Sequence, residues 1–509
     1  MIVDELAFQI RQAFGFIPTA EQTAAINTFC RFMTDTGCHV VMILRGSAGT
    51  GKTSLAAAMV KAMSRLGQKI VLLAPTGRAA KVFSLNAGLP ALTIHRRIYR
   101  QKAFAGDMSK FNLNDNLAQD TLFMVDEASM IANEGMAVSS VFGTGRLLDD
   151  LVSFVYSGRN CRMMLIGDKA QLPPVGEEES PALTASYMSG YGMTVYECDL
   201  NEVLRQAVGS GILYNATAIR QMITHDEITG LPVIRFSGFA DIRMVPGNEL
   251  IEQLNGSYSE VGTDETIVIT RSNKRANIYN AGIRGMVLGR EEELTTGDML
   301  MVVKNNYYWL EKDLQAAAAT IPETVGTPTG QTRRRKGMRA ELFIANGDRA
   351  CVQRVRNVRE MYGFSFADVW LQFPDYDNYE LKVVAILDTL TSDAPALTRD
   401  RSERLFEAVT ADYEDVPLKA DRMKRVRDDM YYNALQIKYA YAMTCHKAQG
   451  GQWAHVYVDQ GYMTDDMLTP DYIHWLYTAF TRATEQLFLV NWPKTQTDFT
   501  GNDDKEQQS

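Results

Sequence analysis

A glycine-rich segment near residue 50 has the residue types and spacing that bind phosphate. Residues 46–53 read Gly-Ser-Ala-Gly-Thr-Gly-Lys-Thr; an apolar run, 40–44, precedes them and helix-prone residues follow. In this P-loop context, glycines let backbone N–H groups turn inward around the β and γ phosphates, Lys52 supplies a positive charge, and the Thr53 hydroxyl reaches Mg²⁺. The residues predicted to contact a nucleotide are Gly46, Ser47, Ala48, Gly49, Thr50, Gly51, Lys52 and Thr53.

A pair of carboxylates follows a second apolar run, residues 122–125. Asp126 can hold Mg²⁺ through water, and Glu127 can polarise a water molecule for attack on the terminal phosphate. An apolar run followed by Asp-Glu is common, and a surface turn would explain it equally well if it stood alone. Because a P-loop lies about 75 residues upstream, the pair predicts nucleotide hydrolysis as well as binding.

A third apolar run, residues 163–166, delivers a polar turn that contains Gly167, Asp168 and Gln171 and is stiffened by two prolines. A single buried glutamine is more often structural. Here the turn is expected at the carboxyl edge of the same sheet as the other two strand ends, where ligands of α/β proteins bind. Gln171 is therefore predicted to sense the γ-phosphate and couple it to movement.

The spacing of apolar runs indicates an α/β fold with two parallel sheets. Runs that alternate with helical segments predict βαβ units, and in the first 205 residues they are 40–44, 70–73, 122–125 and 163–166. A second series predicts another parallel sheet, built from the separated runs 266–270, 456–458 and 487–490. Short β-like pieces without this alternation predict a small β-barrel inserted between them, at 299–303, 349–355, 369–373 and 381–386, with helical residues at 400–428.

Composition bounds the class of protein. The chain has 509 residues, 46% of them apolar, and a net charge of −9, which predicts several folded domains and argues against a uniformly basic coat. Local basic tracks for nucleic acid remain compatible with this charge. The six scattered cysteines form no C-x-x-C pair, and no apolar run approaches 18 residues, so we expect neither a disulfide framework nor a membrane span. The start of the chain lacks the pattern of a signal peptide, and a cytoplasmic location is expected, that of a bacterial host cell if the gene is carried by a phage.

Ordered sequence blocks resemble the superfamily 1 helicases, specifically the Dda/RecD-like branch of superfamily 1B. Residues 16–22 (Phe-Ile-Pro-Thr-Ala-Glu-Gln) resemble the Q motif, although a helix start capped by Thr19 or Thr23 would also explain them. The remaining blocks resemble motifs Ia, Ib, II, III, IV, V and VI in that order: 72–80, 93–98, 126–127, 167–171, 204–206, 441–450 and 475–483. This resemblance covers about residues 10–285 and 435–490.

The resemblance implies roles for further residues. Gln22 would read adenine, Gly450 would lie at the nucleotide, and Arg205 and Arg482 would contact the γ-phosphate from the second motor domain. Guanidinium groups so placed neutralise charge only when the two domains close, which couples hydrolysis to movement. The implied catalytic set is Lys52, Glu127, Gln171, Arg205 and Arg482. The residues implied to bind single-stranded DNA are Pro75, Thr76, His95, Thr444, His446 and Lys447.

The resemblance also implies a domain plan with two RecA-like motor domains. Motor domain 1A is expected at 1–204, with a small insertion, 1B, at about 84–120. Motor domain 2A is expected at 205–286 and 431–500. An SH3-like inserted domain, 2B, with a charged helical extension, is expected at 287–430, and residues 501–509 are expected to be a disordered tail.

Two features keep alternative interpretations. Phe104 and Phe111 could form a strand-separating wedge in the first insertion, but core packing is the more frequent role of such residues. The basic run at 331–340 could contact nucleic acid or form a solvated loop. Its cations are Arg333, Arg334, Arg335, Lys336 and Arg339.

The activity that these features predict is that of an ATP-dependent DNA helicase that uses Mg²⁺ and moves along single-stranded DNA. The resemblance implies 5′→3′ travel, work on forked or tailed duplex DNA as a monomer, and a role in replication, recombination or repair beside single-strand-binding or replisome proteins. An RNA helicase, and an ATP-gated DNA-binding adaptor that does not unwind, are the alternatives. Preference for strands with a 2′-OH would indicate the first, and ATPase activity without strand separation the second.

Overall fold

A computed structural model describes residues 2–101, 111–134, 143–202, 209–224, 230–319, 344–376 and 378–499. The chain divides into two compact units. The first, here called the sheet unit, contains Met1–Lys102, Ser109–Arg271 and Cys445–Ser509. The second, here called the barrel unit, contains Ser272–Thr444. Among the described residues, no helix has both the length and the apolarity needed to cross a membrane.

The first sheet of the sheet unit has six parallel strands in the order β3-β2-β6-β7-β1-β8. Its strands are β1 (Val40–Gly46), β2 (Lys69–Ala74), β3 (Ala91–Thr93), β6 (Thr121–Val125), β7 (Arg162–Gly167) and β8 (Thr194–Leu200). The four strands predicted from apolar runs are all present. The edge strands β3 and β8 carry shorter or more polar sequences, which hid them from the same pattern.

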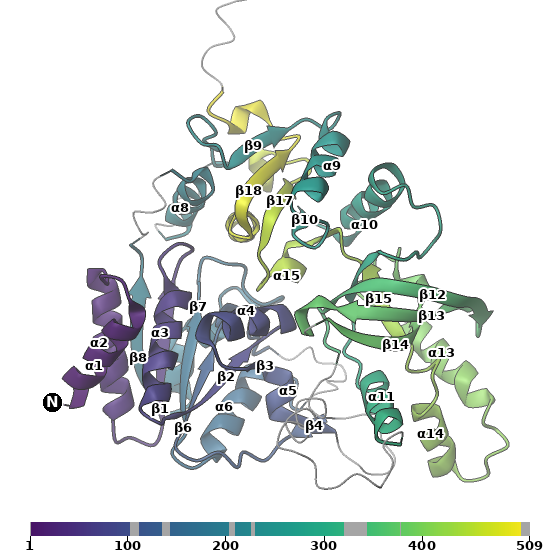
Figure 1. Cartoon of the computed structure of the whole chain (residues 1–509), viewed down its shortest axis with the longest axis horizontal. Helices are drawn as coiled ribbons and strands as arrows, with labels where there is room; N and C mark the ends of the chain where they lie inside the picture. The colour runs from purple at the N-terminus through teal and green to yellow at the C-terminus, as the bar shows by residue number, and fades with distance from the viewer. Residues whose placement is uncertain are drawn as a thin grey trace, which may run out of the picture. The chain divides into compact units, whose positions relative to one another are not determined.

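Helices cover both faces of this sheet because alternate strand residues point to opposite sides. Helices α1, α2 and α3 lie near one another in the sheet unit (Figure 1). Their apolar residues form one core with residues of three strands, Leu44 of β1, Met124 of β6 and Ile166 of β7. On the opposite face, Phe123 of β6 meets Phe154 of α6, with ring centroids 6.1 Å apart. The helices of this part are α1 (Ile2–Phe14), α2 (Ala20–Thr34), α3 (Lys52–Arg65), α4 (Gly77–Ala87), α5 (Ile94–Ile98), α6 (Leu147–Ser157) and α7 (Ala185–Gly190).

A short antiparallel hairpin interrupts the first sheet between α5 and β6. It pairs β4 (Tyr99–Gln101) with β5 (Phe111–Leu113). The hairpin falls within the insertion predicted at 84–120. Phe104, one of the two wedge candidates, lies outside the described residues, whereas Phe111 begins β5.

The second sheet of the sheet unit is also parallel. Its strands in this unit run in the order β10-β17-β18-β9, with bounds β9 (Ile242–Val245), β10 (Thr266–Thr270), β17 (Trp453–Asp459) and β18 (Ala483–Val490). The predicted pairing of two separated chain segments is confirmed by β10 beside β17. Its helices are α8 (Gly211–Thr224), α9 (Leu250–Glu260), α15 (Cys445–Ala448) and α16 (Pro470–Phe480).

The barrel unit contains the predicted inserted β-barrel. Five strands close in the order β11-β12-β13-β14-β15, with bounds β11 (Met299–Val302), β12 (Arg349–Met361), β13 (Phe364–Phe373), β14 (Tyr379–Ile386) and β15 (Leu435–Tyr439). Val369, Leu371 and Val383, which share one face of this sheet, are fully buried. The closing strand β15 lies beyond residue 430, where the sequence placed the end of this domain. It pairs antiparallel with β11 and parallel with β14.

Helices in the barrel unit flank the barrel strands along the chain. They are α10 (Asn273–Gly282), which continues into a π-helical turn (Ile283–Val287), α11 (Tyr308–Ala319), α13 (Arg399–Ala411) and α14 (Lys419–Arg427). The last two confirm the predicted helical residues at 400–428. The strand β16 (Ala442–Thr444) ends the unit. Within the described ranges, the short 3-10 helices are Ala128–Met130, Pro181–Leu183, Pro374–Tyr376, Leu387–Thr389, Asp465–Met467 and Lys494–Gln496.

Candidate nucleotide and nucleic-acid site

The three predicted chemical segments of the first sheet follow three neighbouring strands. β6, β7 and β1 are adjacent and parallel. The P-loop follows β1, Asp126 and Glu127 follow β6, and Asp168 follows β7. Because parallel strands end at the same edge of a sheet, the fold brings these segments together, as expected for a ligand site in an α/β protein.

The P-loop backbone depends on its glycines. Gly49 and Gly51 have φ angles of +77° and +82°, in the left-handed region that favours glycine. A Cβ atom at Gly46 would lie 2.8 Å from both Lys52 Cγ and Thr50 Oγ1. The Lys52 ammonium donates to the carbonyl of Ser47 at 3.0 Å and also to that of Gly46, while Thr53 lies in the first turn of α3. The loop thus fixes Lys52 and Thr53 at the start of α3, and their contacts with phosphate and Mg²⁺ stay predictions.

Gln22 links the start of α2 to the P-loop. Thr19 and Gln22 form a capping box, in which the Thr19 N–H donates to Gln22 Oε1 at 3.0 Å. Gln22 Nε2 donates to the Thr50 carbonyl, also at 3.0 Å, and the side chain is 1% exposed. Residues 16–22 therefore combine features of both interpretations. Thr19 caps the helix, as a helix start requires, and Gln22 reaches the phosphate loop, as a Q motif would. The adenine-reading role of Gln22 stays a prediction.

The carboxylates after β6 are closely spaced. The Glu127 N–H donates to Asp126 Oδ1 at 2.9 Å, and Glu127 itself adopts φ +52°, ψ +38°. Burial raises the pKa of Asp126 to about 7, helped by the charge of Glu127 and opposed by that of Lys52. A buried carboxyl group of this kind gains from a cation beside it, which fits the oxygen-ligand chemistry of Mg²⁺. Thr53 and Asp126 are the residues that would hold that ion.

The turn after β7 is buried and incompletely paired. Asp168 is 4% exposed, and its Oδ1 accepts from the Ala170 N–H at 3.0 Å. Gln171 is 7% exposed, and its Oε1 has no hydrogen-bond partner within the part of the chain that the structure describes. A buried amide oxygen without a partner costs free energy. Its position beside the phosphate segments is compatible with the predicted sensor role.

Helix α16 of the second sheet contacts the nucleotide edge of the first sheet. Tyr477 donates to Asp168 Oδ2 at 2.6 Å and accepts from the Ala48 N–H at 3.0 Å. Thr478 Oγ1 accepts from the Leu172 N–H at 2.8 Å. Tyr477 lies in the block that resembles motif VI, residues 475–483, but no role was predicted for it; its place five residues before Arg482 was the available signal.

The predicted arginines have different outcomes. Arg205 lies outside the described residues. Arg482 is 2% exposed, and its guanidinium donates to Thr478 O, Gly451 O and Thr481 Oγ1 at 3.1 to 3.2 Å. All three acceptors belong to the second sheet's part of the chain, so Arg482 is bound within its own lobe, and its contact with phosphate stays a prediction. An arginine that the sequence analysis missed, Arg220 of α8, does reach the P-loop, at Ser47.

The residues of the first lobe that are predicted to bind DNA follow β2 and β3, at the carboxyl ends of these strands. Pro75 and Thr76 follow β2, and Thr76 caps α4 by accepting from the Ala79 N–H at 3.2 Å. His95 lies in α5, and burial lowers its pKa to about 4, so the imidazole is neutral near pH 7. A neutral His95 can donate a hydrogen bond to a phosphate but adds no charge.

Motif V meets motif Ia inside the sheet unit. A Cβ atom at Gly450, which has φ +71°, would lie 3.1 Å from both Ala79 Cβ and Thr76 Oγ1. This contact puts Gly450 beside the predicted DNA segment, and its place at the nucleotide stays a prediction. His446 and Lys447 lie in α15, just before it, and partial desolvation lowers the pKa of His446. Thr444 ends β16 in the barrel unit.

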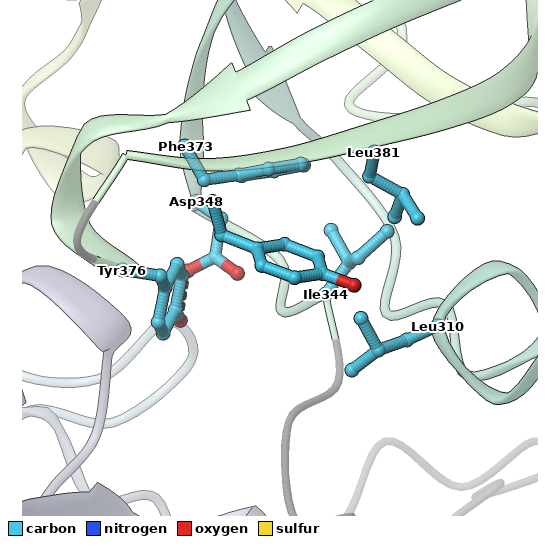
Figure 2. Close-up of a pocket in the computed structure, with 7 residues that line it drawn as sticks. Leu310, Ile344, Asp348, Phe373, Tyr376 and Leu381 are labelled. Carbon is cyan, nitrogen blue, oxygen red and sulfur yellow. Dashed lines mark hydrogen bonds between the residues drawn. The ribbon is translucent and has the colours of Figure 1, made fainter. Parts of the chain in front are cut away.

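A separate small pocket lies in the barrel unit. Its lining residues are Leu310, Ile344, Asp348, Phe373, Tyr376, Tyr379 and Leu381. Figure 2 shows the Asp348 carboxyl group turned toward Tyr376, whose hydroxyl donates to Asp348 Oδ1 at 2.8 Å. None of the predicted site residues lines this pocket.

Comparisons with known proteins agree with the ordered motifs. A family model described as an AAA domain matches residues 18–228, and one described as a UvrD-like helicase C-terminal domain matches residues 439–490. The chain is 26% identical over 291 residues to the ATP-dependent DNA helicase dda of Enterobacteria phage T4, covering 56% of this chain and 60% of that protein. It is 33% identical over 138 residues to the ATP-dependent RecD2 DNA helicase of Deinococcus radiodurans, covering 27% of this chain and 16% of that protein.

Among solved structures, the chain is similar to a Pif1 helicase from Bacteroides in complex with ADP-AlF3 and single-stranded DNA. The TM-score is 0.46 at 14% identity, covering 94% of each chain. The first family model spans the P-loop and the acidic pair, and the second spans most of motif V and all of motif VI. Together these matches support an ATP-dependent DNA helicase of superfamily 1B.

Proposed function

We propose that this DNA helicase translocates 5′→3′ along single-stranded DNA as a monomer and opens forked or tailed duplexes. The observation that carries the proposal is the double contact of Tyr477 with Ala48 of the P-loop and with Asp168 after β7. One side chain of the second lobe thereby meets two nucleotide segments of the first lobe. A change in either segment can move α16, and this is what coupling of hydrolysis to movement requires.

The nucleotide end of the mechanism uses residues of the first lobe. Lys52 and the P-loop N–H groups bind the β and γ phosphates, and Glu127 orients the attacking water. A Mg²⁺ ion held by Thr53 and Asp126 would neutralise charge that develops on the phosphoryl oxygens. Gln171, whose Oε1 has no partner among the described residues, reports on the state of the γ-phosphate to the loop that Thr478 contacts.

The DNA end of the mechanism uses the segments around α4, α5 and α15. Thr76, His95, His446 and Lys447 offer hydroxyl, imidazole and ammonium donors, which suit phosphates better than base edges. Binding without sequence preference follows from such contacts. Motif Ia contacts motif V at Gly450, so relative movement of the lobes would shift these donors along the strand.

Unwinding of matched tailed duplexes tests the proposal. A duplex with a 5′ single-stranded DNA tail should be opened with ATP, whereas the same duplex with a 3′ tail or with blunt ends should not. The Lys52→Ala protein is the matched control and should open none of them. Opening from the 3′ tail would contradict the polarity, preference for an RNA tail would indicate an RNA helicase, and ATP turnover without opening would indicate the adaptor.

A further inference from the structure

Arg220 is a cation of the second lobe that reaches the P-loop. It lies on α8, which packs against α16. Its Nη1 donates to Ser47 Oγ at 2.5 Å, and its Nη2 donates to the Asn201 carbonyl at 3.4 Å. Among the described residues, no carboxylate lies within ion-pair distance of Arg220, and its buried Nε has no hydrogen-bond partner.

Two positive groups therefore converge on one residue of the phosphate loop. Lys52 donates to the Ser47 carbonyl at 3.0 Å, and Arg220 donates to the Ser47 hydroxyl. A half-buried guanidinium group without a counter-ion is costly unless an anion pairs with it. The anion that a P-loop receives is a nucleotide phosphate, and the Lys52 side chain reaches the β and γ phosphates in such loops.

Because this inference deepens the function proposed above, it rests on that function. We propose that Arg220 binds the γ-phosphate of ATP from the second lobe, and that its bond to Ser47 holds the guanidinium at the phosphate site. Arg220 then acts beside Tyr477, which contacts the next loop residue, Ala48. A γ-phosphate recognised by a helix of the opposite lobe gives that lobe a means to distinguish ATP from ADP.

The alternative is that Arg220 is only a structural strut between α8 and the P-loop. A strut works through the Ser47 hydroxyl, so Ser47→Ala would reproduce the effect of Arg220→Ala, and the double variant would add nothing. A phosphate ligand differs in two respects. Arg220→Ala would lower ATP affinity more than Ser47→Ala does, and it would lower the affinity for ATP more than the affinity for ADP.

Equilibrium nucleotide binding to the full-length protein separates these cases. The measurements use the Glu127→Gln background, in which ATP is expected to stay intact, with ATP and ADP as probes in the presence of Mg²⁺. Adding Arg220→Ala should weaken ATP by at least about 10-fold, since a charge-assisted hydrogen bond is worth roughly 1.5–3 kcal/mol. ADP affinity should change less than about 3-fold on the same scale, because ADP lacks the phosphate that the bond requires.

Matched variants complete the test. Arg235→Ala is the control, because Arg235 lies in the same lobe with its guanidinium 5.2 Å from the Tyr214 ring centroid, and it should leave both affinities unchanged. Arg220→Lys should recover part of the ATP preference while Arg220→Gln should not, and circular dichroism checks that each variant folds. Equal weakening of ATP and ADP, or equal effects of Ser47→Ala and Arg220→Ala, would overturn the proposal. These affinities need no DNA, so the outcome is independent of whether the protein unwinds duplexes.

Discussion

Glu127 occupies a backbone conformation that side chains rarely adopt. Its φ of +52° lies in the left-handed region, directly after the fully buried strand β6, and such a conformation costs about 1–2 kcal/mol for a residue other than glycine. Its N–H donates to Asp126 Oδ1, which helps hold the turn. Strain of this kind persists where the surrounding structure enforces it, and it is frequent at active sites.

Replacing Glu127 with Gln should stop ATP hydrolysis without preventing ATP binding. The amide keeps the size of the side chain but cannot act as a base for water, and removal of a general base costs about 10²–10⁴-fold in rate. Steady-state turnover and ATP affinity measured on the same protein check this. Turnover within a few fold of the wild type would show that another group activates the water.

Lys447 and His95 should respond differently to salt, although both are predicted DNA ligands. The pKa of His95 is lowered to about 4, so the ring releases no counter-ion on binding near pH 7. Lys447→Ala should lower the slope of log affinity against log salt by about 1, whereas His95→Ala should weaken binding with an unchanged slope. Fluorescence anisotropy with labelled single-stranded DNA at several salt concentrations measures both. A reduced slope for His95→Ala would contradict the neutral imidazole.

Among the elements, the barrel contains a buried acid at its pocket. Asp348 is 2% exposed, and burial raises its pKa to about 7 even though it accepts from the Ala345 N–H and the Tyr376 hydroxyl. The folded carboxyl group therefore holds its proton at pH values where the unfolded one has lost it. The contribution of Asp348 to the free energy of unfolding is therefore highest at low pH and falls as the pH rises toward 7.

Asp348→Asn should remove this pH dependence from the barrel. For the wild type, the free energy of local unfolding should drop by roughly 2–3 kcal/mol between pH 5 and pH 8, given 1.36 kcal/mol per pKa unit. The asparagine variant should show a flatter profile. Hydrogen exchange of β12–β14 at the two pH values, corrected for intrinsic rates, provides the measurement, and an unchanged profile in the variant would exclude Asp348 as the cause.

The elements that sequence predicted well are those whose pattern is local. Residues 40–44 and 266–270 are continuous β-branched and apolar runs, and each became a buried strand, β1 and β10. Residues 431–500 were assigned to motor domain 2A, but they include β15, which closes the barrel against β11. Its role is set by this closure and not by a local pattern. Arg220 was missed for the same reason, since only the packing of α8 brings it to Ser47.

At the scale of the molecule, the two lobes of the sheet unit are joined at the nucleotide edge by Tyr477. Tyr477→Phe removes a bond to Asp168 and a bond to Ala48 while keeping the ring in place. ATP affinity should change only a few fold, because each lost hydrogen bond contributes about 1 kcal/mol and both join the two lobes to one another rather than to the nucleotide. The stimulation of ATP turnover by DNA should fall much further. Retention of full stimulation would show that coupling runs through other contacts.

Steady-state ATP hydrolysis with and without single-stranded DNA, and with RNA of the same sequence, tests the central claim most directly. If the chain is a motor on DNA, turnover at low salt should rise at least about tenfold with DNA and less with RNA, because binding orders the second lobe against the phosphate segments. Glu127→Gln should abolish turnover in every condition. Equal turnover with and without either polymer would contradict the account, since hydrolysis would then not be coupled to nucleic acid.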